Sequence, residues 1–117
     1  MVKKLTIPLR KAELLEGFPL LRAIPSRKLR MIGGWCFMDI LGPLTLNKRR
    51  RLEVPPHPHI GLQTFSWLLK GRVEHQDSLG SCATISAGEL NLMTAGRGIL
   101  HTEDSPKELL DEEQLHL

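Results

Sequence analysis

Short hydrophobic runs, each closed by turn-forming residues, recur along the chain from residue 53 onward. Residues 62–69 alternate, so that Phe65 and Trp67 fall on one face of an extended strand and Thr64 and Ser66 on the other. Turn signals such as Asp-Ser-Leu-Gly and Ser-Ala-Gly-Glu separate the runs that follow. Further strands are expected at residues 72–76, 82–85, 90–93 and 99–103. This spacing is typical of an all-β barrel or sandwich.

The first part of the chain has a less regular pattern. Residues 1–28 are predicted to form an N-terminal arm with one candidate strand, and residues 11–16 could form a turn of helix that ends at Gly17. Residues 29–41 are rich in β-branched and aromatic side chains, which indicates a strand with a bulge or bend at its Gly-Gly pair.

We therefore divide the chain into an arm (residues 1–28), a single β domain (residues 29–106) and an acidic C-terminal tail (residues 107–117). The tail fits a helical turn or a strand equally well. A length of 117 residues and a hydrophobic content of 41% suit one small globular domain.

Charge is distributed unevenly. Residues 1–60 carry twelve Lys or Arg against four Asp or Glu, whereas residues 61–117 carry four against nine. The densest basic run, Lys48–Arg51, could attract phosphate, but no aromatic residues interleave with it. We interpret it as a solvated loop and do not expect direct nucleic-acid binding.

The cysteine content and the N-terminus bear on location. Cys36 and Cys82 lack the spacing of a thiolate zinc site, and reduced thiols are the simpler interpretation. The N-terminus has no apolar signal region, and no apolar run approaches the ~18 residues of a membrane span. We expect a cytoplasmic protein without a membrane partner.

Two pairs of potential metal ligands stand out. His57 and His59 flank Pro58, and His101 and Glu103 repeat the same i, i+2 spacing. On extended strands each pair projects to one face, and proline holds the first pair extended. Two such strands side by side would direct three imidazoles and one carboxylate at a single point.

This donor set suits Fe(II), Mn, Ni, Cu or Zn, and nitrogen and oxygen donors with open positions favour non-haem Fe(II). A single His-x-His pair is weak evidence, and ordinary structural histidines are the alternative. Two further histidines are not expected to be ligands: His75, beside a turn, is a surface or outer-sphere group, and His116 is next to the last residue.

The same residues resemble the N-terminal domain of pirin, a metal-binding family of the cupin superfamily. The resemblance covers about residues 30–106 and is most specific in Met-Thr-Ala-Gly-Arg-Gly-Ile-Leu-His, which ends at His101. It implies a cupin-type jelly-roll β-barrel that holds iron near its mouth. The implied iron ligands are His57, His59, His101 and Glu103.

The chain departs from the family pattern at two points. Gln63 stands where the first cupin motif usually has Glu, which removes an outer-sphere carboxylate and would shift metal preference or proton handling. The second barrel of pirins has no counterpart here, and the first barrel is expected to lack its final strand or strands. Three explanations are open: a truncated gene product, an expression fragment or a genuine single-domain form. An exposed sheet edge would favour a homodimer.

The resemblance implies three alternative functions. One is a quercetin 2,3-dioxygenase-type enzyme, in which the metal polarises a flavonol-like substrate and Glu103 acts as the catalytic base. Candidates for its barrel wall, or for plain core packing, are Phe65, Trp67, Met93 and Leu100. The second is an iron-dependent, redox-responsive module that binds a protein partner, in the manner of a transcription coregulator, through Lys48–Arg51. The third is a degraded protein with a site but no activity.

Overall fold

The computed structural model describes residues 1–117 and consists of eleven β-strands joined by turns and loops. It confirms the all-β prediction. No helical segment has the length and apolarity that a membrane span requires. The chain divides into two compact parts, Met1–Leu41 and Gly42–Leu117, which are described separately.

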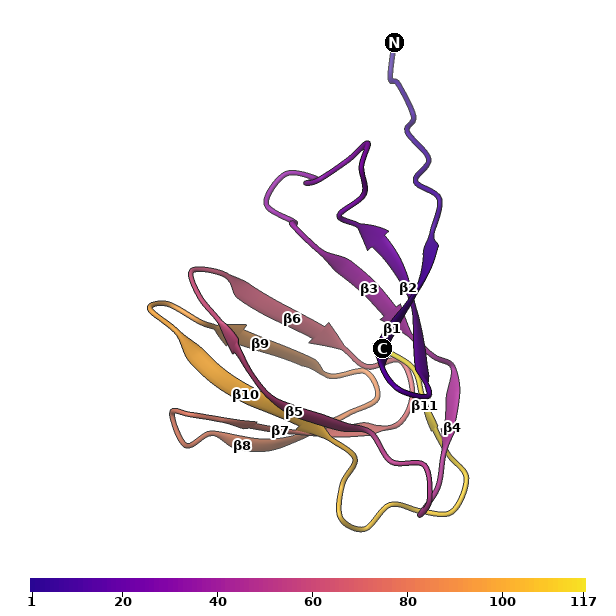
Figure 1. Cartoon of the computed structure of the whole chain (residues 1–117), viewed down its shortest axis with the longest axis vertical. Coiled ribbons are helices and arrows are strands. Elements are labelled where there is room, and N and C mark those ends of the chain that lie inside the picture. The colour runs from indigo at the N-terminus through magenta and orange to yellow at the C-terminus, as the bar shows by residue number, and fades with distance from the viewer. The chain divides into compact units, whose positions relative to one another are not determined.

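The N-terminal part is a three-stranded antiparallel sheet with the strand order β1-β2-β3 (Figure 1). Its strands are β1 (Arg10–Leu15), β2 (Phe18–Ile24) and β3 (Met38–Leu41). Gly17 forms the turn between the first two strands at a φ of 79°, a conformation that glycine adopts without a steric penalty. Across β2 and β3, the Arg22 guanidinium donates two hydrogen bonds of 2.7 Å to the Asp39 carboxylate.

Three sequence expectations for this part were wrong in detail. Residues 11–16 are not a helical turn, because residues 11–15 belong to β1, which pairs with β2, and Glu16 begins the turn to β2. The expected arm holds two strands, where one candidate strand was predicted. The strand predicted over residues 29–41 is confined to Met38–Leu41, because Ile32 and Trp35 hydrogen bond to each other around the two glycines and close a tight turn.

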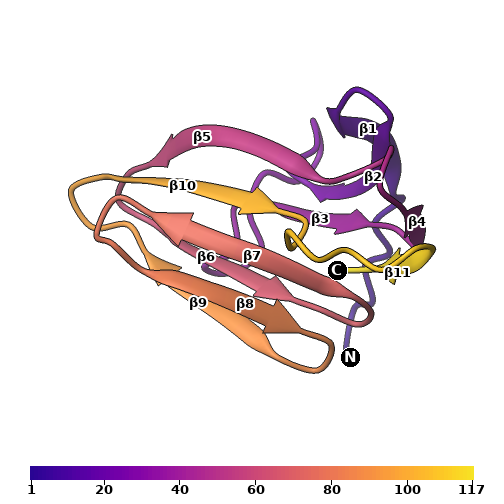
Figure 2. The ribbon, with the colours of Figure 1, turned by 90° about the horizontal axis from the view of Figure 1, so that it is seen from below.

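The C-terminal part contains the predicted series of short strands. A four-stranded antiparallel sheet has the order β5-β10-β7-β8, and two two-stranded ribbons have the orders β6-β9 and β11-β4 (Figure 2). The sheets do not close into a barrel. The strands are β4 (Leu44–Leu46), β5 (Glu53–His59), β6 (Gln63–Trp67), β7 (Arg72–Asp77), β8 (Cys82–Ser86), β9 (Leu90–Thr94), β10 (Ile99–Asp104) and β11 (Glu113–Leu115).

The β6–β9 ribbon packs one face against the four-stranded sheet (Figure 2). A buried hydrophobic cluster accompanies this packing. It consists of Met93 of β9, Ala95 of the β9–β10 loop and Ile99 of β10. The hydroxyl of Ser66 on β6 donates a hydrogen bond of 3.3 Å to the Glu103 carboxylate on β10. The inner face of β6 therefore lies over the strand that carries the second pair of predicted ligands.

The outer face of the same ribbon is apolar and exposed. Phe65 pairs with Leu92 and Trp67 pairs with Leu90, and all four side chains are at least 44% exposed. Leu100 of β10 is also exposed, at 49%. The expectation of a barrel wall or core packing was therefore wrong for Phe65, Trp67 and Leu100. Of the four candidates only Met93 is buried.

The C-terminal tail is a strand rather than a helical turn. Strand β11 pairs with β4, and the Arg72 guanidinium of β7 donates hydrogen bonds of 3.0 and 2.7 Å to Glu113. Gly71, at a φ of 83°, lies so close to the backbone of Gln114 that no side chain fits between them. The tail is thereby held against the start of β7. The boundaries proposed for arm, domain and tail remain predictions.

Candidate metal centre

Strands β5 and β10 bring the two predicted ligand pairs together. They run antiparallel, with His101 directly opposite His57 and Ile99 opposite His59. Pro58 lies between the two histidines of β5 and helps to keep the strand extended, so both imidazoles project from the same face. The register shifts between His101 and Glu103, where β5 contains Pro55 and Pro56. Proline cannot donate to a ladder, which fits the place of β5 at the edge of the sheet.

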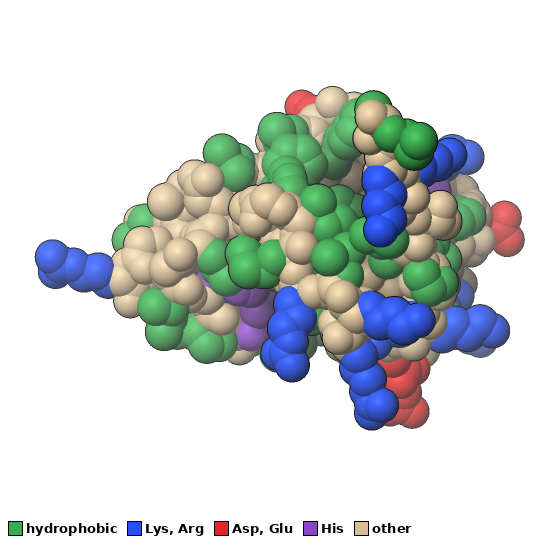
Figure 3. Space-filling view, turned by 90° about the horizontal axis from the view of Figure 1, so that it is seen from above, with side chains coloured by type: hydrophobic (Ala, Val, Ile, Leu, Met, Phe, Trp, Pro, Cys, Tyr) green, Lys and Arg blue, Asp and Glu red, His purple; other side chains and the backbone are tan.

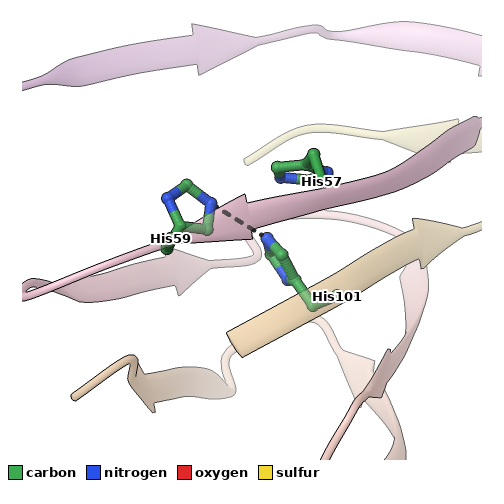
Figure 4. Close-up of side chains that lie close together, drawn as sticks. All are labelled: His57, His59 and His101. Atoms are coloured by element: carbon green, nitrogen blue, oxygen red, sulfur yellow. Dashed lines mark hydrogen bonds between the residues drawn. The ribbon is translucent and has the colours of Figure 1, made fainter. Parts of the chain in front are cut away.

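Three histidines converge at this point (Figure 4). One ring nitrogen from each of His57, His59 and His101 lies within 4.8 Å of the others. The Nε2 atoms of His59 and His101 are 3.1 Å apart. The ring centroids of His57 and His101 are 4.3 Å apart, and those of His59 and His101 are 5.0 Å apart. We call these three side chains the histidine triad.

The triad fits a divalent metal ion by its donor chemistry. Two nitrogens that each lie about 2.1 Å from one ion are about 3 Å apart when they coordinate at a right angle, which matches the separation of the His59 and His101 nitrogens. Because a carbonyl can only accept, His57 must donate through Nδ1 to the Pro55 oxygen 3.0 Å away. In the neutral ring this leaves Nε2 with its lone pair, as a metal ligand requires.

Burial keeps two of these imidazoles neutral. It lowers the pKa of His101 to about 4, with the neighbouring His57 and His59 acting in the same direction. The pKa of His59 is also lowered, first by burial and then by His57. A metal ion that binds His59 or His101 near neutral pH therefore displaces few protons from these two rings.

Glu103, the fourth predicted ligand, is not part of the triad group. Its carboxylate accepts the Ser66 hydrogen bond, and burial raises its pKa above the ordinary value, while a charged His57 acts in the opposite direction. Glu103 and His101 are two residues apart on β10. The role of Glu103 as a ligand or base remains a prediction.

A further pair of side chains continues the site behind His101. The Nδ1 atom of His75 lies 3.4 Å from the Nδ1 atom of His101, and its Nε2 atom lies 3.0 Å from the Asp77 carboxylate. His75 is only 4% exposed, so the surface alternative for it was wrong, and its outer-sphere role remains a prediction. The hydrogen bond between His75 and Asp77 is the main cause of the lowered pKa of Asp77.

Two other sequence candidates lie apart from the triad. Gln63 is exposed and donates a hydrogen bond of 2.8 Å to the Thr94 hydroxyl, on the outer side of the β6–β9 ribbon. The expected effect of Gln63 on metal preference or proton handling remains a prediction. His116 lies in an isolated β-bridge with Lys70.

A pocket lies close to His101. Figure 3 shows histidine side chains that reach the surface, with hydrophobic side chains beside them. A shallow pocket of about 200 Å³ lies over strands β5, β10 and the end of β7. Its lining includes His101 and Asp77, together with side chains from the other face of the sheet: Pro56, Gln76, Ser78, Leu100 and Thr102.

Comparison with known proteins gives consistent matches. The family model described as Pirin matches residues 17–117. A Pseudomonas aeruginosa protein provisionally named quercetin 2,3-dioxygenase is 51% identical over 92% of this chain and 33% of its own length. A pirin-like protein of Caulobacter vibrioides is 43% identical over 76% of this chain and 32% of its own length.

A solved structure matches the fold at high similarity. The crystal structure of a quercetin 2,3-dioxygenase from Acinetobacter baumannii has a TM-score of 0.85 and 52% identity, over 93% of this chain and 36% of that one. This likeness confirms the cupin-type fold. The chain spans about a third of the length of each of these three proteins.

Proposed function

The chain belongs to the pirin family, and from that premise we propose that its histidine triad binds iron(II) and supports quercetin 2,3-dioxygenase-type opening of a flavonol ring with O₂. The observation that carries the proposal is the convergence of His57, His59 and His101 within 4.8 Å. Relatives named quercetin 2,3-dioxygenase support the substrate class. Nitrogen and oxygen donors with open positions support iron over zinc, which prefers a closed tetrahedron.

The chain's own residues would divide the work. The triad holds the ion, and Glu103 takes either a fourth position or the proton of the flavonol hydroxyl. A bound ion supplies a Lewis acid for the substrate oxygens and redox chemistry with O₂. The raised pKa of Glu103 brings this carboxylate nearer to the working range of a general base, and the Ser66 hydroxyl holds one of its oxygens in place.

The test begins with the metal. Protein is loaded with Fe(II) without oxygen, the bound metal is measured by mass spectrometry, and O₂ uptake is then followed with quercetin. We expect about one iron per chain and quercetin-dependent uptake, both lost in His101→Ala and both retained in the control His116→Ala. Preferential loading with Mn, Ni, Cu or Zn would change the metal assignment. Iron-loaded protein that consumes no O₂ with any flavonol would exclude the enzyme.

The alternative function is a redox-responsive surface for a protein partner. One observation favours it: Lys48 and Arg49 are exposed at the tip of the β4–β5 loop, where the Asn47 side chain accepts hydrogen bonds from two backbone N–H groups. Arg51, in contrast, donates to the carbonyls of Ser105 and Pro106 and holds the loop. Partner binding that differs between Fe(II) and Fe(III) and is lost with Lys48→Glu would select this function.

A cytoplasmic location is part of the proposal. Cys36 and Cys82 are both unpaired and exposed. Exposed free thiols persist in a reducing compartment and become oxidised outside it. Thiol titration of protein isolated from cells under rapid alkylation should find both cysteines reduced.

A further inference from the structure

His101 of the triad is the first of three side chains that contact one another in series, followed by His75 and Asp77. His101 on β10 lies opposite Asp77 on β7, and His75 lies opposite Glu103, so these side chains share one face of the sheet. The ring nitrogens of His101 and His75 are in contact, and His75 in turn contacts Asp77. The side chains of His75 and Asp77 are 5% and 6% exposed. Water therefore has little access to this chain of contacts.

The turn after β7 fixes the orientation of the Asp77 carboxylate. Its Oδ1 atom accepts hydrogen bonds from the backbone N–H of Leu79 at 2.9 Å and of Ser81 at 3.1 Å. Its Oδ2 atom is then the one directed at His75, 3.0 Å from Nε2. A carboxylate can only accept, so His75 donates through Nε2.

The remaining proton positions follow in order. A neutral His75 that carries its proton on Nε2 presents a bare Nδ1 to His101. His101 must then donate through its own Nδ1, which leaves its Nε2 bare. That Nε2 atom is the one that lies 3.1 Å from the Nε2 atom of His59 in the triad. Each proton position is determined by the one before it, starting from two backbone N–H groups.

We propose that Asp77 and His75 are positioning residues that fix His101 as the Nδ1–H tautomer and so present its Nε2 lone pair to a metal ion. This inference rests on the proposed metal-binding function. Outer partners of ligand histidines generally set the tautomer and ring orientation, and their loss typically lowers metal affinity by about 10- to 100-fold.

Asp77→Asn is the decisive substitution because the turn constrains how an amide can sit. The two backbone donors require an oxygen, so the oxygen of the new amide stays with Leu79 and Ser81 and its NH₂ group faces His75. His75 must then accept through Nε2 and carry its proton on Nδ1. His101 is forced in turn to accept through Nδ1 and to carry its proton on Nε2, and this proton must leave Nε2 before a metal ion can bind there.

His57 provides an internal control, because the Pro55 carbonyl sets its tautomer independently of Asp77. Glu74→Gln provides the matched control variant. It makes the same acid-to-amide change on the same strand, and the Glu74 carboxylate contacts Gln76 rather than His75.

The experiment reads the ring protons of metal-free, ¹⁵N-labelled protein by long-range proton–nitrogen NMR near pH 7.5. In the wild type we expect the proton on Nδ1 for His57 and His101 and on Nε2 for His75. Asp77→Asn should reverse His75 and His101 and leave His57 unchanged, and Glu74→Gln should change none. Titration with Fe(II) in the absence of oxygen should show an affinity about 10- to 100-fold lower for Asp77→Asn only.

The outcomes separate the two proposals. A wild-type His101 with its proton on Nε2 overturns the inference even where Asp77→Asn fails to fold. Unchanged tautomers in folded Asp77→Asn, or reversed tautomers with unchanged Fe(II) affinity, also overturn it. Tautomers that reverse as expected in a protein that binds no metal support the positioning of His101 and contradict the proposed function instead.

Discussion

The Nδ1 atom of His57 lies 3.0 Å from the carbonyl oxygen of Pro55, two residues earlier on the same strand. The backbone of β5 thus determines which nitrogen of His57 carries the proton. His101 reaches the same state by a longer route through His75 and Asp77. The tautomer of His57 on β5 is therefore set locally. The tautomer of His101 on β10 depends on the pairing of β10 with β7.

The imidazole of His101 should titrate far below an ordinary histidine. Burial lowers its pKa from 6.5 to about 4 in the folded chain. Proton NMR of the metal-free protein should show a His101 midpoint near 4. A His101 midpoint at 6 or above would contradict the burial argument.

The same pKa predicts the sign of the acid effect on stability. Between pH 6.5 and about 4 the unfolded chain takes up a proton at His101 that the folded chain does not, so the free energy of unfolding falls as the pH is lowered. Urea unfolding of the metal-free protein at pH 7 and pH 5 should show this loss. His101→Gln should show a smaller loss over the same interval.

Glu103→Gln separates the chemical role of this carboxylate from its packing. The amide oxygen can still accept the Ser66 hydrogen bond, so we expect a folded protein of nearly unchanged thermal stability. A general base or anionic ligand would be lost, so quercetin-dependent O₂ uptake by the iron-loaded protein should fall by at least about 100-fold. Glu74→Gln is the control, and equal activity of both variants would remove Glu103 from the mechanism.

Glu113→Gln tests the ion pair that holds the tail to β7. Arg72 lowers the pKa of Glu113 below its ordinary 4.5 through a bidentate hydrogen bond. The pair therefore stabilises the fold above pH 4.5, and this contribution disappears as the pH falls through the lowered pKa. Glu113→Gln should cost about 1 kcal/mol of unfolding free energy at pH 7, and the difference from wild type should shrink below pH 4.

Two glycines with almost the same backbone conformation separate conformational strain from steric overlap. Gly71 and Gly88 have φ values of 83° and 84°, but a methyl group at Gly71 would overlap the Gln114 carbonyl, whereas nothing lies within 4 Å at Gly88. Gly88→Ala should cost about 1 kcal/mol, for strain alone. Gly71→Ala should cost at least about 2 kcal/mol more, because β11 must shift. Equal costs in chemical unfolding would show that the tail is not packed as described.

The sequence predicted the elements whose pattern is local. Alternation in residues 62–69 and the i, i+2 spacing of His57 and His59 depend only on the two-residue period of a strand, and both were confirmed. Period alone does not say which face of a strand is covered. Phe65 and Trp67 were accordingly assigned to a wall or a core, whereas the structure leaves them exposed.

His75 shows the corresponding limit for the site. Its separation from His101 along the chain is 26 residues, and the two meet only because β7 pairs with β10 in one particular register. A shift of one residue would turn His75 to the opposite face. The signal that could have pointed to it is His75-Gln-Asp77, an i, i+2 pair of the same kind as His101 and Glu103.

The prolines of β5 also affect how this protein meets other copies of itself. Three of the seven residues in this edge strand have no backbone N–H, so an arriving strand would find acceptors without matching donors. Strand addition and fibril growth at this edge are therefore disfavoured. Within this sheet, a homodimer that pairs strand edges would use β8, at the other end.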